Sequence, residues 1–311
     1  MQIEQSFSDY TSKNEIISGS GNYYIHNAIF SFHYRNRAIY LNSNSKVFLE
    51  TCTFYNNSST ERGGSFYIKD SDCVLVHICI LLSSIVENNL YGCGYYIWSV
   101  KNSNSKSYAF ESSVSQCSGI SASLYHLRGD IKVSNMNTSY HEITQVAAYS
   151  IQVPTGTGII NFTTASNASS TDYAVIENSI GKFNITKCNY LNNEYTGSTN
   201  GIIYCSSSCT YSSCSFIGNK GNYLFNKKPT IDNCYFNNNE VRQTTFDSIE
   251  PLDSFISHYS TYCIAAKNEE NKDDTFKKYK EEKLKMKNLK NVVKKIYRTP
   301  LVGAVNLSVL K

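Results

Sequence analysis

The sequence predicts an all-β fold, a parallel β-helix in which short strands stack coil upon coil, followed by a charged C-terminal α-helix. Three observations carry this prediction. A strand-and-turn motif recurs along the chain, most of the chain favours strands and turns, and the composition changes abruptly near residue 267. With 311 residues, the chain is long enough to bury an extended core.

Composition excludes two other classes of protein. The 34 Asn and 43 Ser favour turns, while the 25 Tyr and 15 Phe favour strands. So many aromatic residues argue against disorder, and the scarcity of strong helix formers before residue 265 argues against a helical bundle. The net charge of +4 is uneven, since residues 265–311 carry +7 and the remainder carries −3. A nearly neutral body with a basic terminal segment does not indicate a nucleic-acid partner.

The motif Cys-x-aromatic-x-x-Asn occurs four times. Its copies are Cys52, Phe54 and Asn57; Cys188, Tyr190 and Asn193; Cys214, Phe216 and Asn219; and Cys234, Phe236 and Asn239. The Cys and the aromatic residue point to the same face of a strand, and both suit a core. We expect the Asn to occupy the turn, because Asn tolerates left-handed backbone, and stacked copies to bond their amides in a ladder. A Gly then allows a tight corner, as at Gly63 and Gly64.

A repeat of 20 to 30 residues with two or three strands predicts one coil of a β-helix. One coil cannot bury its own face, whereas stacked coils share a core, and roughly nine coils of about 25 residues are expected. The predicted organisation is a lead-in or cap (1–19), the β-helix (20–250), a linker (251–266), a charged amphipathic helix (267–298) and a tail (299–311).

The C-terminal helix is predicted from apolar residues at helical spacing, followed by Pro300 as a stop. These residues are Tyr279, Met286, Leu289, Val293 and Ile296. One interpretation is a terminal helix that caps the solenoid or stands free. The other is a basic amphipathic helix that contacts an anionic membrane or a partner.

Phe-x-x-Asn followed by Gly-Gly and a hydrophobic run, as in Phe54 to Ile68, resembles the polymorphic outer membrane protein repeat. The usual form of that repeat has Gly-Gly-Ala-Ile, whereas Ser65 and Phe66 follow the glycine pair here. The Asn-, Tyr- and Cys-rich version is similar to β-helical surface proteins of trichomonad-type protists. The resemblance covers roughly residues 20–245. It implies a right-handed, pectin-lyase-like β-helix that is adhesin-like and displayed at the cell surface or secreted.

The start of the chain and its apolar stretches predict something different. Residues 1–6 have neither a basic start nor an apolar run, and no stretch approaches the ~20 apolar residues of a membrane helix. Taken alone, the residues therefore predict a soluble, unexported chain.

The eleven cysteines have two interpretations, a ladder of small buried thiols or an extracellular disulfide framework. The cluster Cys205, Cys209 and Cys214 has spacings that suit a bridge and fit zinc poorly. Sequons of the form Asn-x-Ser/Thr are glycan acceptors in a secreted protein, and chance matches in a chain so rich in Asn and Ser. They lie at Asn56, Asn57, Asn137, Asn161, Asn167, Asn184 and Asn306.

No catalytic signature is present. Asp70 and Asp72 are the best pair of carboxylates for glycoside chemistry, but their surroundings favour a turn. His126 lies near Arg128 and Asp130 without a catalytic spacing. The tripeptide from Arg128 to Asp130 spells an integrin-type Arg-Gly-Asp sequence, with an ordinary turn as the alternative. We predict neither a metal nor a cofactor.

These observations favour a non-enzymatic surface or adhesin-like repeat protein that binds glycans or proteins of a host or neighbouring cell. Its Tyr- and Asn-rich faces would supply ring stacking and amide contacts. Membrane contact is expected only through the basic tail helix. The alternatives are a degenerate pectin-lyase-like carbohydrate-active enzyme and a truncated paralogue without a separate function.

Overall fold

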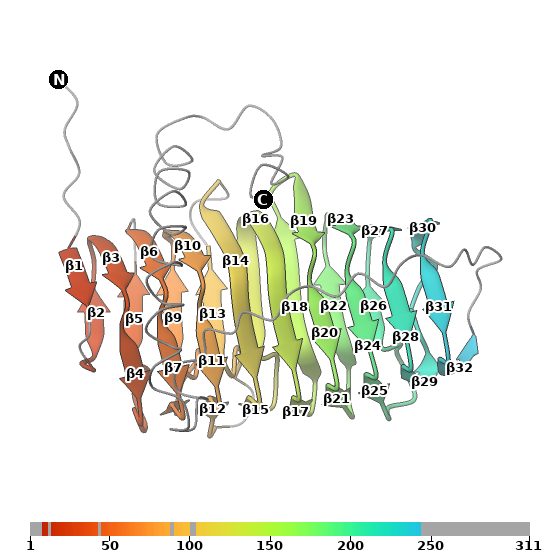
Figure 1. The fold of residues 1–311 in the computed structure, drawn as a ribbon, viewed down its shortest axis with the longest axis horizontal. Helices are drawn as coiled ribbons and strands as arrows, with labels where there is room; N and C mark the ends of the chain where they lie inside the picture. Colours follow the sequence, from red (N-terminus) through yellow and green to blue (C-terminus); the bar gives the residue numbers. More distant parts are fainter. Residues whose placement is uncertain (1–7, 12–13, 43–44, 88–89, 100–103, 244–311) are drawn as a thin grey trace, which may run out of the picture. The chain divides into compact units, whose positions relative to one another are not determined.

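The computed structural model describes residues 8–11, 14–42, 45–87, 90–99 and 104–243 (Figure 1). Every named element in these ranges is a β-strand, and the paired strands run parallel. The predicted β-helix is thereby confirmed as a parallel β-solenoid. None of the described residues forms a helix that is long and apolar enough to cross a bilayer. The predicted linker, charged helix and tail lie outside the described residues.

Each coil passes through four strand positions, which stack on those of neighbouring coils as four parallel ladders. Along the chain they follow in the order I, II, III and IV, and a loop then returns to ladder I. Ladders I to III belong to one 24-stranded sheet, because β14 and β16 continue from one ladder into the next, and ladder IV is a separate sheet of eight strands. About eight coils are therefore present, close to the number expected.

The strands divide among the ladders as follows. Ladder I contains β2 (Ile17–Gly19), β5 (Ile39–Asn42), β9 (Phe66–Lys69), β13 (Tyr95–Trp98), the start of β16 (Leu124–Ser139), β18 (Val146–Pro154), β22 (Ala174–Ser179) and β26 (Ile203–Cys205). Ladder II contains β1 (Ser8–Thr11), β3 (Asn22–His26), β6 (Lys46–Glu50), β10 (Asp72–Val76), β14 (Lys106–Ser115), the middle of β16, β19 (Thr157–Asn161), β23 (Lys182–Thr186), β27 (Ser208–Ser212) and β30 (Thr230–Asp232). Ladder III contains β4 (Ile29–Ser31), β7 (Thr53–Tyr55), β11 (Cys79–Leu81), the ends of β14 and β16, β20 (Thr164–Ser166), β24 (Asn189–Leu191), β28 (Ser215–Ile217) and β31 (Tyr235–Asn237). Ladder IV contains β8 (Ser58–Ser59), β12 (Ser84–Ile85), β15 (Ser118–Gly119), β17 (Glu142–Ile143), β21 (Ser169–Ser170), β25 (Glu194–Tyr195), β29 (Lys220–Tyr223) and β32 (Glu240–Gln243).

The ladders include part of the segment expected to precede them. Strands β1 and β2 lie within residues 1–19 and already pair in parallel with β3 and β5. Equivalent residues of successive coils are between 15 and 34 positions apart in the sequence. Between residues 100 and 185 the spacing stays between 24 and 28 positions, so the period is hard to see there because the motif residues are missing.

Two corners recur from coil to coil with a residue of left-handed backbone, with φ between 47° and 66°. The corner between ladders I and II has such a residue in four coils, at Asp70, Arg128, Val153 and Ile180. The corner between ladders II and III is formed by Asn27, Thr51, His77, Glu111, Asn135, Phe162, Lys187, Ser213 and Asn233. The corner between ladders III and IV is formed by Phe32, Asn56, Leu82, Gln116, Tyr140, Asn167, Asn192, Gly218 and Asn238. Asn is the commonest corner residue because its short polar side chain tolerates this conformation.

The expectation that the motif Asn occupies the turn is wrong by one residue. The left-handed positions are Asn56, Asn192, Gly218 and Asn238, each of which directly precedes a motif Asn. The corner residue projects outward, and the residue after it turns its side chain into the solenoid. Asn219, for example, is completely buried.

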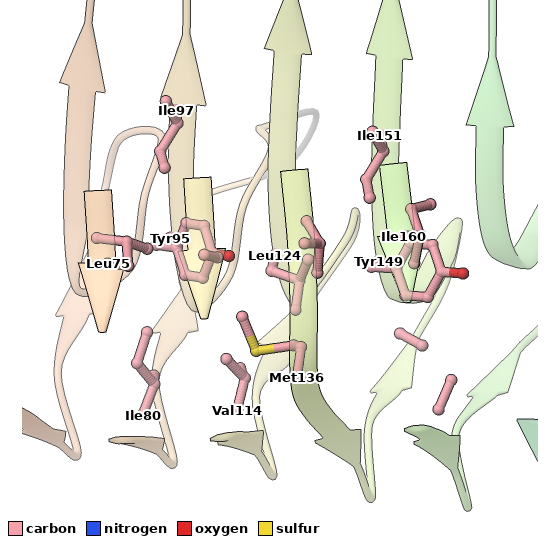
Figure 2. Packing of buried hydrophobic residues seen from close by; sticks show 14 of the residues in the cluster. Leu75, Ile80, Tyr95, Ile97, Val114, Leu124, Met136, Tyr149, Ile151 and Ile160 are labelled. Carbon is pink, nitrogen blue, oxygen red and sulfur yellow. The ribbon is translucent and has the colours of Figure 1, made fainter. Parts of the chain in front are cut away.

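The core is one continuous cluster of inward-facing side chains along the solenoid (Figure 2). The motif aromatics stack within ladder III, where the ring centroid of Phe216 is 5.0 Å from that of Tyr190 and 4.8 Å from that of Phe236. In an earlier coil, Phe54 lies 5.0 Å from Phe30 in the same way. Offset stacking between parallel neighbours adds to the free energy gained by burying each ring.

Candidate binding surface

The motif asparagines form a ladder of amides inside the last coils. Oδ1 of Asn219 accepts hydrogen bonds from the backbone N–H and from the side-chain amide of Asn193, each at 3.1 Å. Oδ1 of Asn239 serves Asn219 in the same way, at 3.0 and 2.9 Å. The Asn219 amide also donates to the carbonyl of Tyr190 at 2.8 Å. Nearer the N-terminus, Asn57 Oδ1 accepts the backbone N–H of His33 at 3.0 Å.

The motif cysteines likewise accept backbone hydrogen bonds, at the corner between ladders II and III. Sγ of Cys214 accepts the backbone N–H of Cys188 at 3.4 Å, and Sγ of Cys234 accepts that of Cys214 at 3.3 Å. In a coil without the motif, Oγ of Ser112 accepts the N–H of Ile78 at 2.9 Å. The amide ladder and the cysteine ladder thus accept hydrogen bonds from backbone N–H groups that point inward at the left-handed corners. The motif therefore has a structural role.

The structure contains both buried thiols and a disulfide, the two states considered for the cysteines. Seven buried cysteines are free thiols, and Cys205 forms a disulfide with Cys209, whereas Cys214 remains free. The free thiols are Cys52, Cys73, Cys93, Cys117, Cys188, Cys214 and Cys234. Burial raises the pKa of Cys52 to about 12, so this thiol stays protonated and unreactive.

The glycine pair is fixed by close backbone approach. A Cβ on Gly64 would lie 1.9 Å from the carbonyl oxygen of Cys93 in the next coil. Gly63 has φ +77°, and a Cβ there would lie 2.2 Å from the carbonyl oxygen of Phe66. Neither position accepts a larger residue without moving a strand.

The sequons occupy different environments. Asn57 and Asn137 are buried and leave no room for a glycan on the folded chain, whereas Asn167 and Asn184 are exposed. Asn56 and Asn161 are half-buried, and Asn306 lies outside the described residues. Among the sequons that the structure describes, the exposed pair is the best placed for modification.

The segments considered for catalysis and cell binding are parts of the scaffold. Asp70 has φ 50° and lies at a corner, so it does not share a strand face with Asp72, whose carboxylate accepts the backbone N–H of Lys106 at 2.9 Å. The tripeptide from Arg128 to Asp130 lies within β16 and not at a loop tip. The Asp130 carboxylate is bonded to the Tyr108 hydroxyl.

A buried Ser–His pair is the nearest approach to a catalytic arrangement. Nε2 of His126 lies 2.8 Å from the Tyr95 hydroxyl, and Nδ1 lies 2.7 Å from Oγ of Ser107. All three side chains are buried in the core, where no substrate reaches them. Among the described residues, no group of three or more His, Cys, Asp or Glu is placed to hold a metal ion.

The most distinctive surface is a strip of outward-facing residues on ladder I. Ile39 and Leu41 of β5 point into the core, so Tyr40 between them points outward. Parallel register continues this position into a column, here called the outer strip. It consists of Tyr40, Tyr67, Tyr96, Tyr125, Ser150, Glu177 and Tyr204.

Its first four tyrosines form a continuous aromatic row. The ring centroids are 5.7 Å apart for Tyr40 and Tyr67, 5.3 Å for Tyr67 and Tyr96, and 4.8 Å for Tyr96 and Tyr125. The rings of Tyr67, Tyr96 and Tyr125 are buried, while Tyr40 stays half-exposed. Burial raises the pKa of Tyr67 to about 12, so its phenol remains neutral. The repeat motif gave no hint of this row, because it depends on register between strands.

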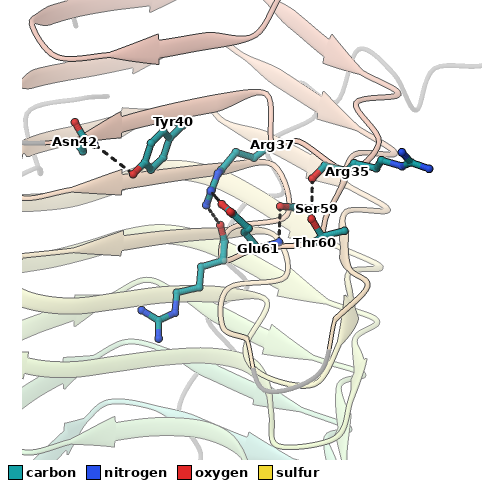
Figure 3. A network of polar contacts seen from close by, with 8 residues as sticks. Arg35, Arg37, Tyr40, Asn42, Ser59, Thr60 and Glu61 are labelled. Atoms are coloured by element: carbon teal, nitrogen blue, oxygen red, sulfur yellow. Dashed lines mark hydrogen bonds and ion pairs between the residues drawn. The ribbon is translucent and has the colours of Figure 1, made fainter.

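Arg37 covers the first end of the row (Figure 3). Its guanidinium lies 4.6 Å from the ring centre of Tyr40 and 5.2 Å from that of Tyr67. It also pairs with the carboxylate of Glu61 and donates to the carbonyl of Arg62. Desolvation lowers the pKa of Arg37, although the neighbouring carboxylate and ring faces suit a cation.

A second cationic patch lies on the neighbouring coil. Arg62 lies 5.8 Å from the ring centre of Tyr91, 5.7 Å from that of Tyr96 and 5.4 Å from that of Trp98. Lys69 lies 5.2 Å from the Trp98 ring. No ion pair between described residues includes Arg62 or Lys69. This part of the surface therefore combines aromatic rings with cations that remain available to a ligand.

The strip changes character beyond Tyr125. Ser150 contributes only a hydroxyl, and the next residue, Glu177, is a carboxylate that is only 6% exposed. Glu177 accepts hydrogen bonds from Ser150 Oγ at 2.6 Å, from Gln152 Nε2 at 2.7 Å and from Ser179 Oγ at 2.9 Å. Sequence reasoning missed Glu177 because a single acid in a strand carries no pattern.

Comparison with protein-family models, curated proteins and solved structures gives no match to this chain.

Proposed function

We propose that this chain is a non-enzymatic, adhesin-like β-helix repeat protein that binds glycans through the outer strip. In this proposal the solenoid is right-handed and pectin-lyase-like, akin to polymorphic outer membrane protein repeats, and it is secreted or displayed at a cell surface. Right-handed crossovers are the general rule for parallel strands, which supports that hand.

The observation that carries the proposal is the aromatic row with its two cationic patches. Phenol and indole rings pack against the apolar faces of sugars, while hydroxyls, amides and guanidinium groups bond to sugar oxygens. The half-exposed rings of Tyr40 and Trp98 flank the patches, and Arg62 and Lys69 can reach an acidic sugar.

A glycan-array experiment tests the proposal. The purified chain should bind a subset of glycans, and Trp98→Ala and Tyr40→Ala should each weaken binding about fivefold or more, as aromatic anchors do. Tyr140→Ala is the matched control, because Tyr140 is exposed on a corner away from ladder I. Binding that survives both strip variants, or no binding to any glycan, would refute the proposed surface.

Surface display is tested by mapping N-glycans on the native protein. We expect modification at Asn167 and Asn184 and none at the buried Asn57 and Asn137. Unmodified Asn167 and Asn184 in natively expressed protein would argue against passage through the secretory pathway.

A further inference from the structure

The far end of the outer strip has a chemistry that the glycan proposal does not use. Glu177 is buried, yet all three of its hydrogen-bond donors are uncharged. No ion pair among the described residues includes it. A buried carboxylate without a countercharge is costly, and a bound cation would offset that cost.

Aromatic residues neighbour Glu177 in the column and in its own coil. Tyr204 follows Glu177 in the column, and Tyr173 precedes β22 in the same coil as Glu177. The ring centroids of Tyr173 and Tyr204 are 4.7 Å apart, inclined at 45°, and both rings are half-exposed. Tyr173 packs against the cluster that contains Tyr125. Burial and the charge of Glu177 raise the pKa of Tyr125, which therefore remains a neutral phenol.

We propose that Glu177, Tyr125, Tyr173 and Tyr204 form a site for a quaternary ammonium group, such as the trimethylammonium of choline. Ring faces attract cations through their quadrupole, and a nearby carboxylate adds a direct Coulomb attraction. This site shares Tyr125 with the aromatic row that carries the glycan proposal, while Glu177, Tyr173 and Tyr204 lie outside that row.

The donors around Glu177 favour a methylated ammonium over a primary one. A carboxylate offers about four lone-pair sites, and three hydrogen bonds already occupy most of them. A primary ammonium needs acceptors for its three N–H groups, which this carboxylate can no longer supply. A trimethylammonium group donates no hydrogen bonds and gains only from charge and ring contact.

Calorimetric titration of the full chain with choline chloride tests the site, with ethanolamine and sodium chloride as comparison ligands. We expect saturable binding of choline and weaker binding of ethanolamine. Glu177→Gln keeps the shape and removes the charge, and should weaken choline binding about tenfold. Tyr173→Leu removes one ring face and should weaken it about fivefold. Tyr140→Leu, on an exposed corner away from ladder I, should leave it unchanged.

Several results would overturn the site. They are no saturable choline binding by the native chain, equal binding of ethanolamine, and unchanged affinity in both Glu177→Gln and Tyr173→Leu. Thermal unfolding checks whether each variant is folded. If Glu177→Gln does not fold, the choline affinity of Tyr173→Leu tests the site instead. Phosphatidylcholine vesicles and free phosphocholine, run in parallel, distinguish a lipid headgroup from a soluble ligand, because only the first retains the chain on vesicles.

Discussion

The C-terminal coils and the middle coils solve the same problem with different residues. In the C-terminal coils, Cys188, Cys214 and Cys234 stack at one corner and the motif asparagines stack at the other. In the middle coils, Ser112 takes the place of a Cys, and Nδ1 of His141 accepts the backbone N–H of Cys117 at 3.1 Å. Each position requires a buried acceptor for an inward N–H, and the identity of the residue is secondary.

Removing one rung of the amide ladder should have the largest effect. Asn219→Leu leaves the backbone N–H of Asn193, one of its amide hydrogens and the carbonyl of Tyr190 without their partners. At about 1–3 kcal/mol for each unsatisfied buried group, we expect a loss of about 4 kcal/mol in the free energy of unfolding. Urea denaturation measures it.

Asn184→Leu is the matched control for this rung. Asn184 is exposed on ladder II, so the same chemical change should alter stability by less than about 0.5 kcal/mol. Equal losses in the two variants would mean that the ladder contributes nothing beyond the general effect of replacing an Asn by Leu.

The middle coils should instead show a dependence on pH. Burial lowers the pKa of His126 and of His141 to about 3, from an ordinary value of 6.5. The unfolded chain therefore binds more protons below pH 6.5, so the stability is fully present above that pH and is lost as the pH falls towards 3. Each His contributes a slope of about 1.4 kcal/mol per pH unit, or about 2 kcal/mol by pH 5.

His141→Asn separates this effect from the titration of carboxylates. Asn can accept the N–H of Cys117 as the motif asparagines do, but it does not titrate. The variant should lose about 1.4 kcal/mol per pH unit from the slope between pH 6.5 and pH 5. A slope identical to that of the native chain would show that His141 titrates normally.

The sequence predicts the fold well where like residues recur, and poorly elsewhere. Four copies of one motif predicted the strand direction, the core aromatics and the amide ladder, because the same residue types recur at the same spacing within each copy. Ser112, Cys117 and His141 do the same work without resembling one another, so their register could not be read. The outer strip was also invisible, since its residues meet only through strand pairing between coils.

A smaller effect is expected from the thiol ladder. Cys214→Ala removes the acceptor of the Cys188 N–H and should cost about 2 kcal/mol. Cys214→Ser should cost less than about 1 kcal/mol, because Ser112 already performs this role in a middle coil. Urea denaturation of both variants checks the difference, and a serine variant as unstable as the alanine variant would show that the thiol acts only by filling space.

The smallest expected change in stability concerns Asn178, which shares an inward-facing column with His126. His126, Ile151 and Asn178 occupy equivalent positions in successive coils. His126 has partners on both ring nitrogens, whereas the buried amide of Asn178 has only the hydroxyls of Tyr149 and Tyr211 beside it, and among the described residues it forms no hydrogen bond of normal geometry. A buried amide whose polar neighbours are poorly aligned for hydrogen bonding destabilises the fold, and Leu has a similar volume. Asn178→Leu should therefore raise the free energy of unfolding by about 1 kcal/mol in urea denaturation. A loss of similar size would show that the amide is hydrogen-bonded in solution, and that the middle and C-terminal coils satisfy their interior polar groups equally well.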